Sequence, residues 1–145
     1  METLIKSLEE LDAEAARFVE GLIPEKNSAT LINLSGELGA GKTAFTKAVA
    51  RVLGVVETVN SPTFVIEKIY LLPEKQKFRR LIHIDAYRLE NGKSLSPLGF
   101  DEIVKDEQNL ILLEWPEKVS EAIQKPTAQI SLKVLSDESR MISYG

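Results

Sequence analysis

The most informative stretch of the chain reads Gly36-Glu37-Leu38-Gly39-Ala40-Gly41-Lys42-Thr43. It matches the P-loop pattern G-x-x-x-x-G-K-[ST] at every fixed position. In such a loop the glycines let successive backbone N–H groups turn toward a polyphosphate, and the positive end of the following helix adds to that field. We therefore predict that residues 36–43 bind nucleotide phosphates, with Lys42 reaching the outer phosphates and Thr43 offering its hydroxyl to Mg²⁺. The alternative interpretation is a glycine-rich surface turn.

The segments on either side of the loop fit this prediction. Residues Ala29 to Leu34 are short and β-compatible, and they lead directly into the glycines. After the loop, apolar side chains recur at helical spacing until Gly54, at Phe45, Ala48, Val49 and Val52. Strand, loop and helix therefore follow in the order that a P-loop fold requires.

The remaining elements predict a mixed sheet between helices. Ser7 and Glu10 have the form of a capping box, so we expect a first helix from about Leu8 to Gly21. The other predicted elements are an antiparallel hairpin of Phe64 to Tyr70 with Arg79 to Tyr87, a loop from Asn91 to Gly99, a short helix from Phe100 to Glu107, a buried strand from Leu110 to Glu114, a short helix from Lys118 to Gln124, and a C-terminal hairpin of Ala128 to Leu135 with Arg140 to Tyr144. Together they predict an α/β, three-layer P-loop NTPase fold with a mixed parallel and antiparallel sheet and a C-terminal β-hairpin.

Composition limits the possible kinds of protein. With 145 residues, of which 43% are hydrophobic, the chain suffices for one core, so we predict a single P-loop domain over residues 1–145. No apolar run is long enough for a membrane span, and the chain has no cysteine. The net charge of −4 is spread along the chain and gives no broad basic surface. We expect a cytoplasmic protein that meets nucleic acid only indirectly, through a protein partner.

Two carboxylates are candidates for the metal beside the phosphates. Asp85 ends the strand Leu81-Ile82-His83-Ile84, and Glu114 ends the strand Leu110-Ile111-Leu112-Leu113. Mg²⁺ prefers oxygen ligands, and ligands gather at the carboxyl ends of parallel strands. Both acids are therefore candidate Mg²⁺ ligands and catalytic residues, and a solvated acid at a strand exit is the alternative for each.

Three further positions have two interpretations each. His83 shares a strand face with Asp85, so it is either a residue that orients the metal shell or a hydrogen-bonded core histidine. Trp115 either walls the cleft or packs as an ordinary aromatic residue. Thr63, in Asn60-Ser61-Pro62-Thr63, is either a switch contact for the γ-phosphate or part of a simple Ser-Pro turn.

Five segments, taken in order, resemble the TsaE (YjeE) family. They are the loop 36–43, Ser61-Pro62-Thr63-Phe64, His83-Ile84-Asp85-Ala86-Tyr87-Arg88-Leu89, Leu98-Gly99-Phe100-Asp101-Glu102 and Glu114-Trp115-Pro116-Glu117. Many NTPases share the loop, whereas the ordered set is specific. The resemblance covers about Leu31 to Glu117.

The resemblance implies a bacterial ATPase needed for the threonylcarbamoyl modification of adenosine 37 in tRNAs that read ANN codons. It implies ATP and Mg²⁺ as cofactors and TsaD and TsaB as protein partners, whose complex the ATPase remodels or resets. Carried over to this chain, it makes Lys42 the phosphate clamp, Thr43 and Glu114 metal ligands, Asp85 a residue near the γ-phosphate and metal, and Thr63 the switch contact. Many family members have a threonine near the base after an acidic pair, but Leu11 stands there in this chain.

The sequence disfavours a GTPase and leaves two other classes of nucleotide-binding protein as alternatives. A GTPase is disfavoured because neither Asn-Lys-x-Asp nor Asp-x-x-Gly follows the loop. A small-molecule kinase is an alternative, since Asp85 could deprotonate an acceptor hydroxyl and Arg88 could bind an acidic substrate, although no arginine-rich lid segment is visible. A non-catalytic nucleotide switch is the third possibility.

Overall fold

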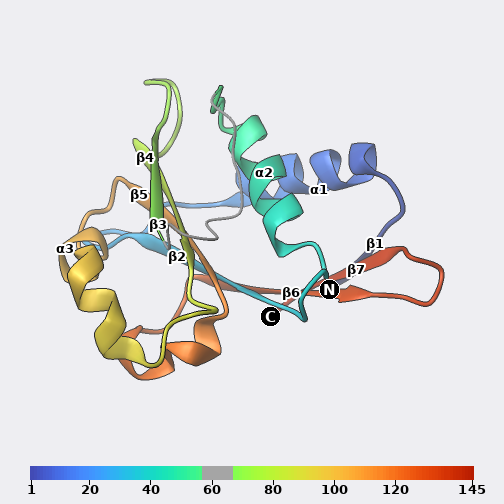
Figure 1. Ribbon diagram of the computed structural model, residues 1–145. Coiled ribbons are helices and arrows are strands. Elements are labelled where there is room, and N and C mark those ends of the chain that lie inside the picture. The colour runs from blue at the N-terminus through green and yellow to red at the C-terminus, as the bar shows by residue number, and fades with distance from the viewer. Residues whose placement is uncertain (57–66) are drawn as a thin grey trace.

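A seven-stranded sheet forms the middle layer of the computed structural model, which describes residues 1–56 and 67–145 (Figure 1). Its strand order is β1-β7-β6-β2-β5-β4-β3. The strands are β1 (Glu2–Ile5), β2 (Thr30–Ser35), β3 (Glu67–Leu71), β4 (Arg80–Asp85), β5 (Asn109–Glu114), β6 (Ala128–Val134) and β7 (Arg140–Tyr144). Strands β4, β5, β2 and β6 are parallel, and the three outer pairings are antiparallel. The predicted mixed sheet and the C-terminal hairpin are confirmed.

Two apolar cores cover the two faces of the sheet, because successive residues of a strand point to opposite sides. In β5, Leu110 and Leu112 belong to the core under α1 (Leu8–Gly21) and α2 (Lys42–Val52). Ile111 and Leu113 belong to the second core, under α3 (Phe100–Ile103) and the 3-10 segments η1 (Gly92–Leu98), η2 (Pro116–Lys118) and η3 (Ser120–Ala122). Figure 1 shows these two groups on opposite sides of the sheet. The predicted three layers are therefore confirmed.

The first helix has the predicted bounds. The Ser7 side chain accepts a hydrogen bond from the Glu10 backbone N–H at 3.1 Å, which is the capping contact expected at a helix N-terminus. At the other end, the Lys77 ammonium donates to the carbonyls of Glu20 and Leu22, at 2.9 and 2.8 Å. These contacts satisfy backbone groups that a helix end leaves without intrahelical partners.

Four details differ from the sequence prediction. The helix expected over 118–124 is two separate 3-10 turns, η2 and η3, because Val119 between them has the non-helical angles φ −131° and ψ 22°. Helix α3 ends at Ile103 rather than near Glu107, and η1 occupies the expected loop over 91–99. Strand β1 was not predicted, since only Ile5 of its four residues is buried and no alternation marks it. None of the helices in the described ranges is long and apolar enough to cross a membrane.

Candidate phosphate and metal site

Two glycines in the loop between β2 and α2 have backbone angles that other residues rarely adopt. Gly36, with φ +149°, lies so close to β6 that an added Cβ would sit 2.6 Å from the Leu132 carbonyl oxygen. Gly41, with φ +106°, is the N-cap of α2, and no side chain of the described residues caps that end of the helix. Its N-terminal N–H groups are thus available to an anion, as phosphate binding requires.

Lys42 lies folded back on the loop. Its side-chain ammonium donates to the carbonyl oxygens of Gly36 and Glu37, at 2.5 and 2.9 Å, although the residue is only 5% exposed. Burial lowers the pKa of Lys42, while the nearby Glu114 and Asp85 carboxylates act in the opposite direction. The amine therefore lies within electrostatic reach of both predicted acids, and a phosphate in the loop would give it a charged partner.

The structure brings Asp85 and Glu114 together at the edge of the sheet that carries the loop. They are directly opposite each other in the parallel pairing of β4 with β5, so their side chains share one face. Burial raises the pKa of Asp85 and Glu114 adds to this, whereas the Tyr87 backbone N–H, which donates to Asp85 at 3.0 Å, opposes it. Such a pair, with Asp85 half-buried and Glu114 buried, is a suitable oxygen donor set for a divalent cation.

Two neighbouring carboxylates are a donor set of the kind through which proteins bind Mg²⁺. Among residues 1–56 and 67–145, no three His, Cys, Asp or Glu side chains are grouped so as to hold a metal ion. Magnesium is commonly bound through one or two carboxylates, with substrate phosphates and waters completing its shell. Thr43 lies in the first turn of α2, next to Lys42, where its hydroxyl is the third candidate ligand.

His83 contacts Glu114 rather than Asp85. Its ring Nε2 lies within hydrogen-bond distance of Glu114 Oε2, and both side chains are buried, at 0% and 3% exposure. An ionised carboxylate can only accept a hydrogen bond, so it pairs with an Nε2 that carries a proton. Nδ1 has no hydrogen-bond partner within the described part of the chain. This arrangement commits one oxygen of Glu114 to the histidine.

Aromatic rings border the site on the side of β5. The Trp115 ring lies 4.4 Å from the Lys42 ammonium and 4.9 Å, between centroids, from the Tyr87 ring. Trp115 also packs against the second core and has φ +59°, an uncommon backbone conformation for a bulky residue. It therefore both packs against the core and contacts the Lys42 side chain beside the loop. Sequence reasoning missed Tyr87, which lies only two residues after Asp85.

Of the other positions named from the sequence, Thr63 is not described by the structure and Leu11 lies in the core. Thr63 falls outside the described residues, as do Ser61 and Pro62, so the switch contact stays a prediction. Leu11 is buried in the core beneath α1, at 6% exposure. Within the loop, Leu38 is exposed and Ala40 is buried. The structure thus gathers Lys42, Asp85 and Glu114 with the loop, and leaves Leu11 in the hydrophobic interior.

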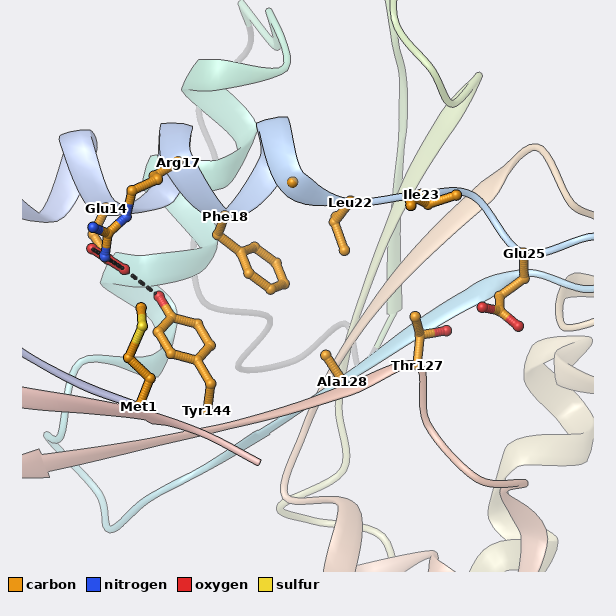
Figure 2. Close-up of a pocket in the computed structure, with 11 residues that line it drawn as sticks. Met1, Glu14, Arg17, Phe18, Leu22, Ile23, Glu25, Thr127, Ala128 and Tyr144 are labelled. Atoms are coloured by element: carbon orange, nitrogen blue, oxygen red, sulfur yellow. Dashed lines mark hydrogen bonds and ion pairs between the residues drawn. The ribbon is translucent and has the colours of Figure 1, made fainter.

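A separate hollow of about 590 Å³ lies at the far end of α1 (Figure 2). At its wall, Glu14 accepts hydrogen bonds from Arg17 and from the Tyr144 hydroxyl, the latter at 2.6 Å. Phe18 stacks on Tyr144 with 5.9 Å between ring centroids. Thr127 and Ala128, at the start of β6, line the other side, so the hollow lies toward the sheet edge away from the loop. These contacts tie β7 to α1.

The sheet order, the glycine loop after β2 and the acids at the ends of β4 and β5 define a P-loop protein of the α/β class. A sequence model of the family "Threonylcarbamoyl adenosine biosynthesis protein TsaE" matches residues 5–142. The chain belongs to the TsaE family.

Individual relatives agree with this assignment. The chain is 39% identical over 117 residues to the tRNA threonylcarbamoyladenosine biosynthesis protein TsaE of Bacillus subtilis, covering 79% of this chain and 68% of that protein. It is 36% identical over 140 residues to the protein of the same name from Rickettsia prowazekii, covering 96% and 90%. The crystal structure of YdiB from Bacillus subtilis superposes with a TM-score of 0.77 at 30% identity, covering 99% of this chain and 83% of YdiB.

Proposed function

We propose that this protein is a cytoplasmic ATPase that binds and hydrolyses ATP with Mg²⁺ and acts on a TsaD/TsaB complex during formation of N6-threonylcarbamoyladenosine at position 37 of tRNA. Family membership supports the pathway. One observation carries the nucleotide chemistry: the Lys42 ammonium lies against the loop carbonyls, within reach of the two carboxylates that β4 and β5 place in register.

Each residue of the site has a distinct part in this proposal. The N–H groups of residues 36–43 bind the phosphates, and Lys42 turns from the loop carbonyls to the outer phosphate oxygens. Thr43, Asp85 and Glu114 hold Mg²⁺, which when bound neutralises charge on the transferred phosphoryl group. Thr63, by family resemblance, contacts the γ-phosphate.

His83 is the positioning residue for Glu114 in this scheme. Because Nε2 fixes one carboxylate oxygen, the other oxygen is presented to the metal in one orientation. Protein partners, rather than this chain, supply the tRNA contact, since the net charge of −4 does not favour binding to a polyanion.

The test compares release of inorganic phosphate from ATP with and without TsaB and TsaD. We expect stimulation by the partners, and we expect Glu114→Ala and Asp85→Ala each to lower the stimulated rate by about 100-fold, because each removes a ligand of the metal. Glu74→Ala, which removes an exposed acid from the turn between β3 and β4, is the matched control and leaves the rate unchanged. Wild-type rates in both site variants, with the fold intact, would contradict the proposal.

A further inference from the structure

Arg140 lies beside the phosphate loop, although it is far from it in sequence. It is the first residue of β7, and β7 begins at the edge of the sheet where β6 ends. A Cβ built on Gly41 would lie 3.8 Å from Arg140 Nε and 4.0 Å from its Cδ. The arginine side chain therefore runs along the outside of the loop at the residue before Lys42.

The face of β7 also directs Arg140 toward the nucleotide side of the sheet. Ile142, two residues further on, belongs to the core beneath α1 and α2. Since residues two apart in a strand share a face, Arg140 points to the same layer as α2, whose N-terminus carries the loop.

The Arg140 guanidinium can donate more hydrogen bonds than the one that it makes within the described residues. Its Nη1 donates to the Glu138 carbonyl oxygen at 2.5 Å. Within residues 1–56 and 67–145, none of the ion pairs involves Arg140. A guanidinium carries five N–H donors, and a diphosphate is a ligand that such a planar fork matches.

The order of strands decides which end of the nucleotide Arg140 meets. Asp85 and Glu114 lie on β4 and β5, to one side of β2, whereas Arg140 lies on the β6–β7 hairpin, to the other side. A metal held by Asp85 and Glu114 would bind the terminal phosphates, so those phosphates would lie toward β5. The α-phosphate and the nucleoside would then extend toward the hairpin.

We propose that Arg140 binds the α- and β-phosphates of the nucleotide and is a second cationic clamp opposite Lys42. This inference rests on the proposed ATP binding. The α- and β-phosphates are present both in the triphosphate and in the diphosphate product. Arg140 therefore contributes equally to the binding of the two nucleotides.

The test is calorimetric titration of the full chain with MgATP and with MgADP. We expect Arg140→Gln to weaken both nucleotides by a similar factor, about tenfold, because a charge-assisted contact to phosphate is lost from both. Lys133→Gln is the matched control, since Lys133 carries the same charge on the same hairpin but is exposed and points to the opposite face from the buried Leu132. We expect it to bind like the wild type.

Three outcomes would overturn the inference or its premise separately. Wild-type affinity of Arg140→Gln for both nucleotides removes Arg140 from the site. Weakened ATP with unchanged ADP places the guanidinium at the γ-phosphate and contradicts the assignment. Absence of binding by the wild-type chain contradicts the proposed function itself. If circular dichroism shows that Arg140→Gln does not fold, Arg140→Met, which keeps the aliphatic stem, carries the same test and the same criteria.

Discussion

Asp85 is held in the folded protein at a cost in stability. Burial raises its pKa, and the neighbouring Glu114 adds to the shift. A group whose pKa is raised on folding binds more protons in the folded state than in the unfolded state. Its contribution is therefore most favourable at low pH and is lost as the pH rises through the folded pKa. A divalent cation bound at this carboxylate would offset the cost, because an opposite charge favours the ionised form.

At the residue scale we predict that Asp85→Asn stabilises the nucleotide-free protein. The amide oxygen can still accept from the Tyr87 N–H, while the buried charge is gone. The gain in melting temperature should grow as the pH is raised from about 4 to about 8, across the range in which a carboxyl with a raised pKa ionises. Thermal unfolding followed by circular dichroism measures it. A loss of stability at neutral pH, or a gain that does not vary with pH, would contradict the account.

At the scale of elements, the loop depends on how closely β2 and β6 approach each other. Gly36 leaves no room for a side chain against the Leu132 carbonyl, whereas at Gly39, with φ +81°, no atom of the described residues lies within 4 Å of an added Cβ. The two glycines thus separate two effects. Gly36 combines steric exclusion with an unusual backbone angle, and Gly39 has the backbone angle alone.

We predict that Gly36→Ala lowers the free energy of unfolding by about 2 to 3 kcal/mol and abolishes nucleotide binding, because the loop must move off β6. Gly39→Ala, the matched control, should cost only about 1 kcal/mol, from the strained φ. Urea unfolding of both variants measures the difference. Equal costs in the two variants would show that contact with Leu132 is not the limiting factor.

The elements that the sequence predicts are those with a local chemical signal. The capping box at Ser7 fixed the start of α1, and the apolar run over 110–114 identified β5. Strand β1 has no such signal, since its pairing with β7 is made by residues at the other end of the chain. The helix expected over 118–124 was wrong because Pro116 and the non-helical Val119 impose short 3-10 turns.

The candidate site also contains some features that the sequence predicts and others that it does not. The loop and the two acids were predictable from spacing, because strand ends in a parallel sheet meet at one edge. The contact of His83 with Glu114 and the approach of Arg140 to Gly41 depend on register and on the course of the C-terminal hairpin. Those are properties of the assembled sheet, and no residue pattern near either site encodes them.

At the scale of the whole molecule, the two ends of the chain are fastened together. The Tyr144 N–H donates to the Met1 carbonyl at 3.0 Å, and the Tyr144 hydroxyl donates to Glu14 on α1 (Figure 2). Burial raises the pKa of Tyr144 well above its usual value, and Glu14 adds to this. The protonated hydroxyl thus supports the buried Glu14 carboxylate together with Arg17.

We predict that Tyr144→Phe lowers the free energy of unfolding by about 1 to 2 kcal/mol at neutral pH, because Glu14 loses a donor. The raised pKa means that this contribution is complete below about pH 10 and is lost above it. The wild type should therefore lose stability more steeply than the variant in alkali. Urea unfolding at several pH values measures both effects.

Tyr87→Phe removes a hydroxyl from a ring that is 42% exposed and provides the control, with an expected change within about 0.5 kcal/mol. Equal losses in the two phenylalanine variants, or identical alkaline profiles of wild type and Tyr144→Phe, would contradict a structural role for the Tyr144–Glu14 contact.

The central claim is that residues 36–43 grip a triphosphate while Asp85 and Glu114 hold a divalent cation beside it. Calorimetric titration of ATP into the wild type and into Lys42→Ala, each with and without Mg²⁺, tests it most directly. We predict measurable binding by the wild type that strengthens with Mg²⁺, and affinity at least about tenfold weaker in Lys42→Ala, which loses its charged contact to phosphate. No heat from the wild type with MgATP, or equal affinity in the variant, would contradict the account.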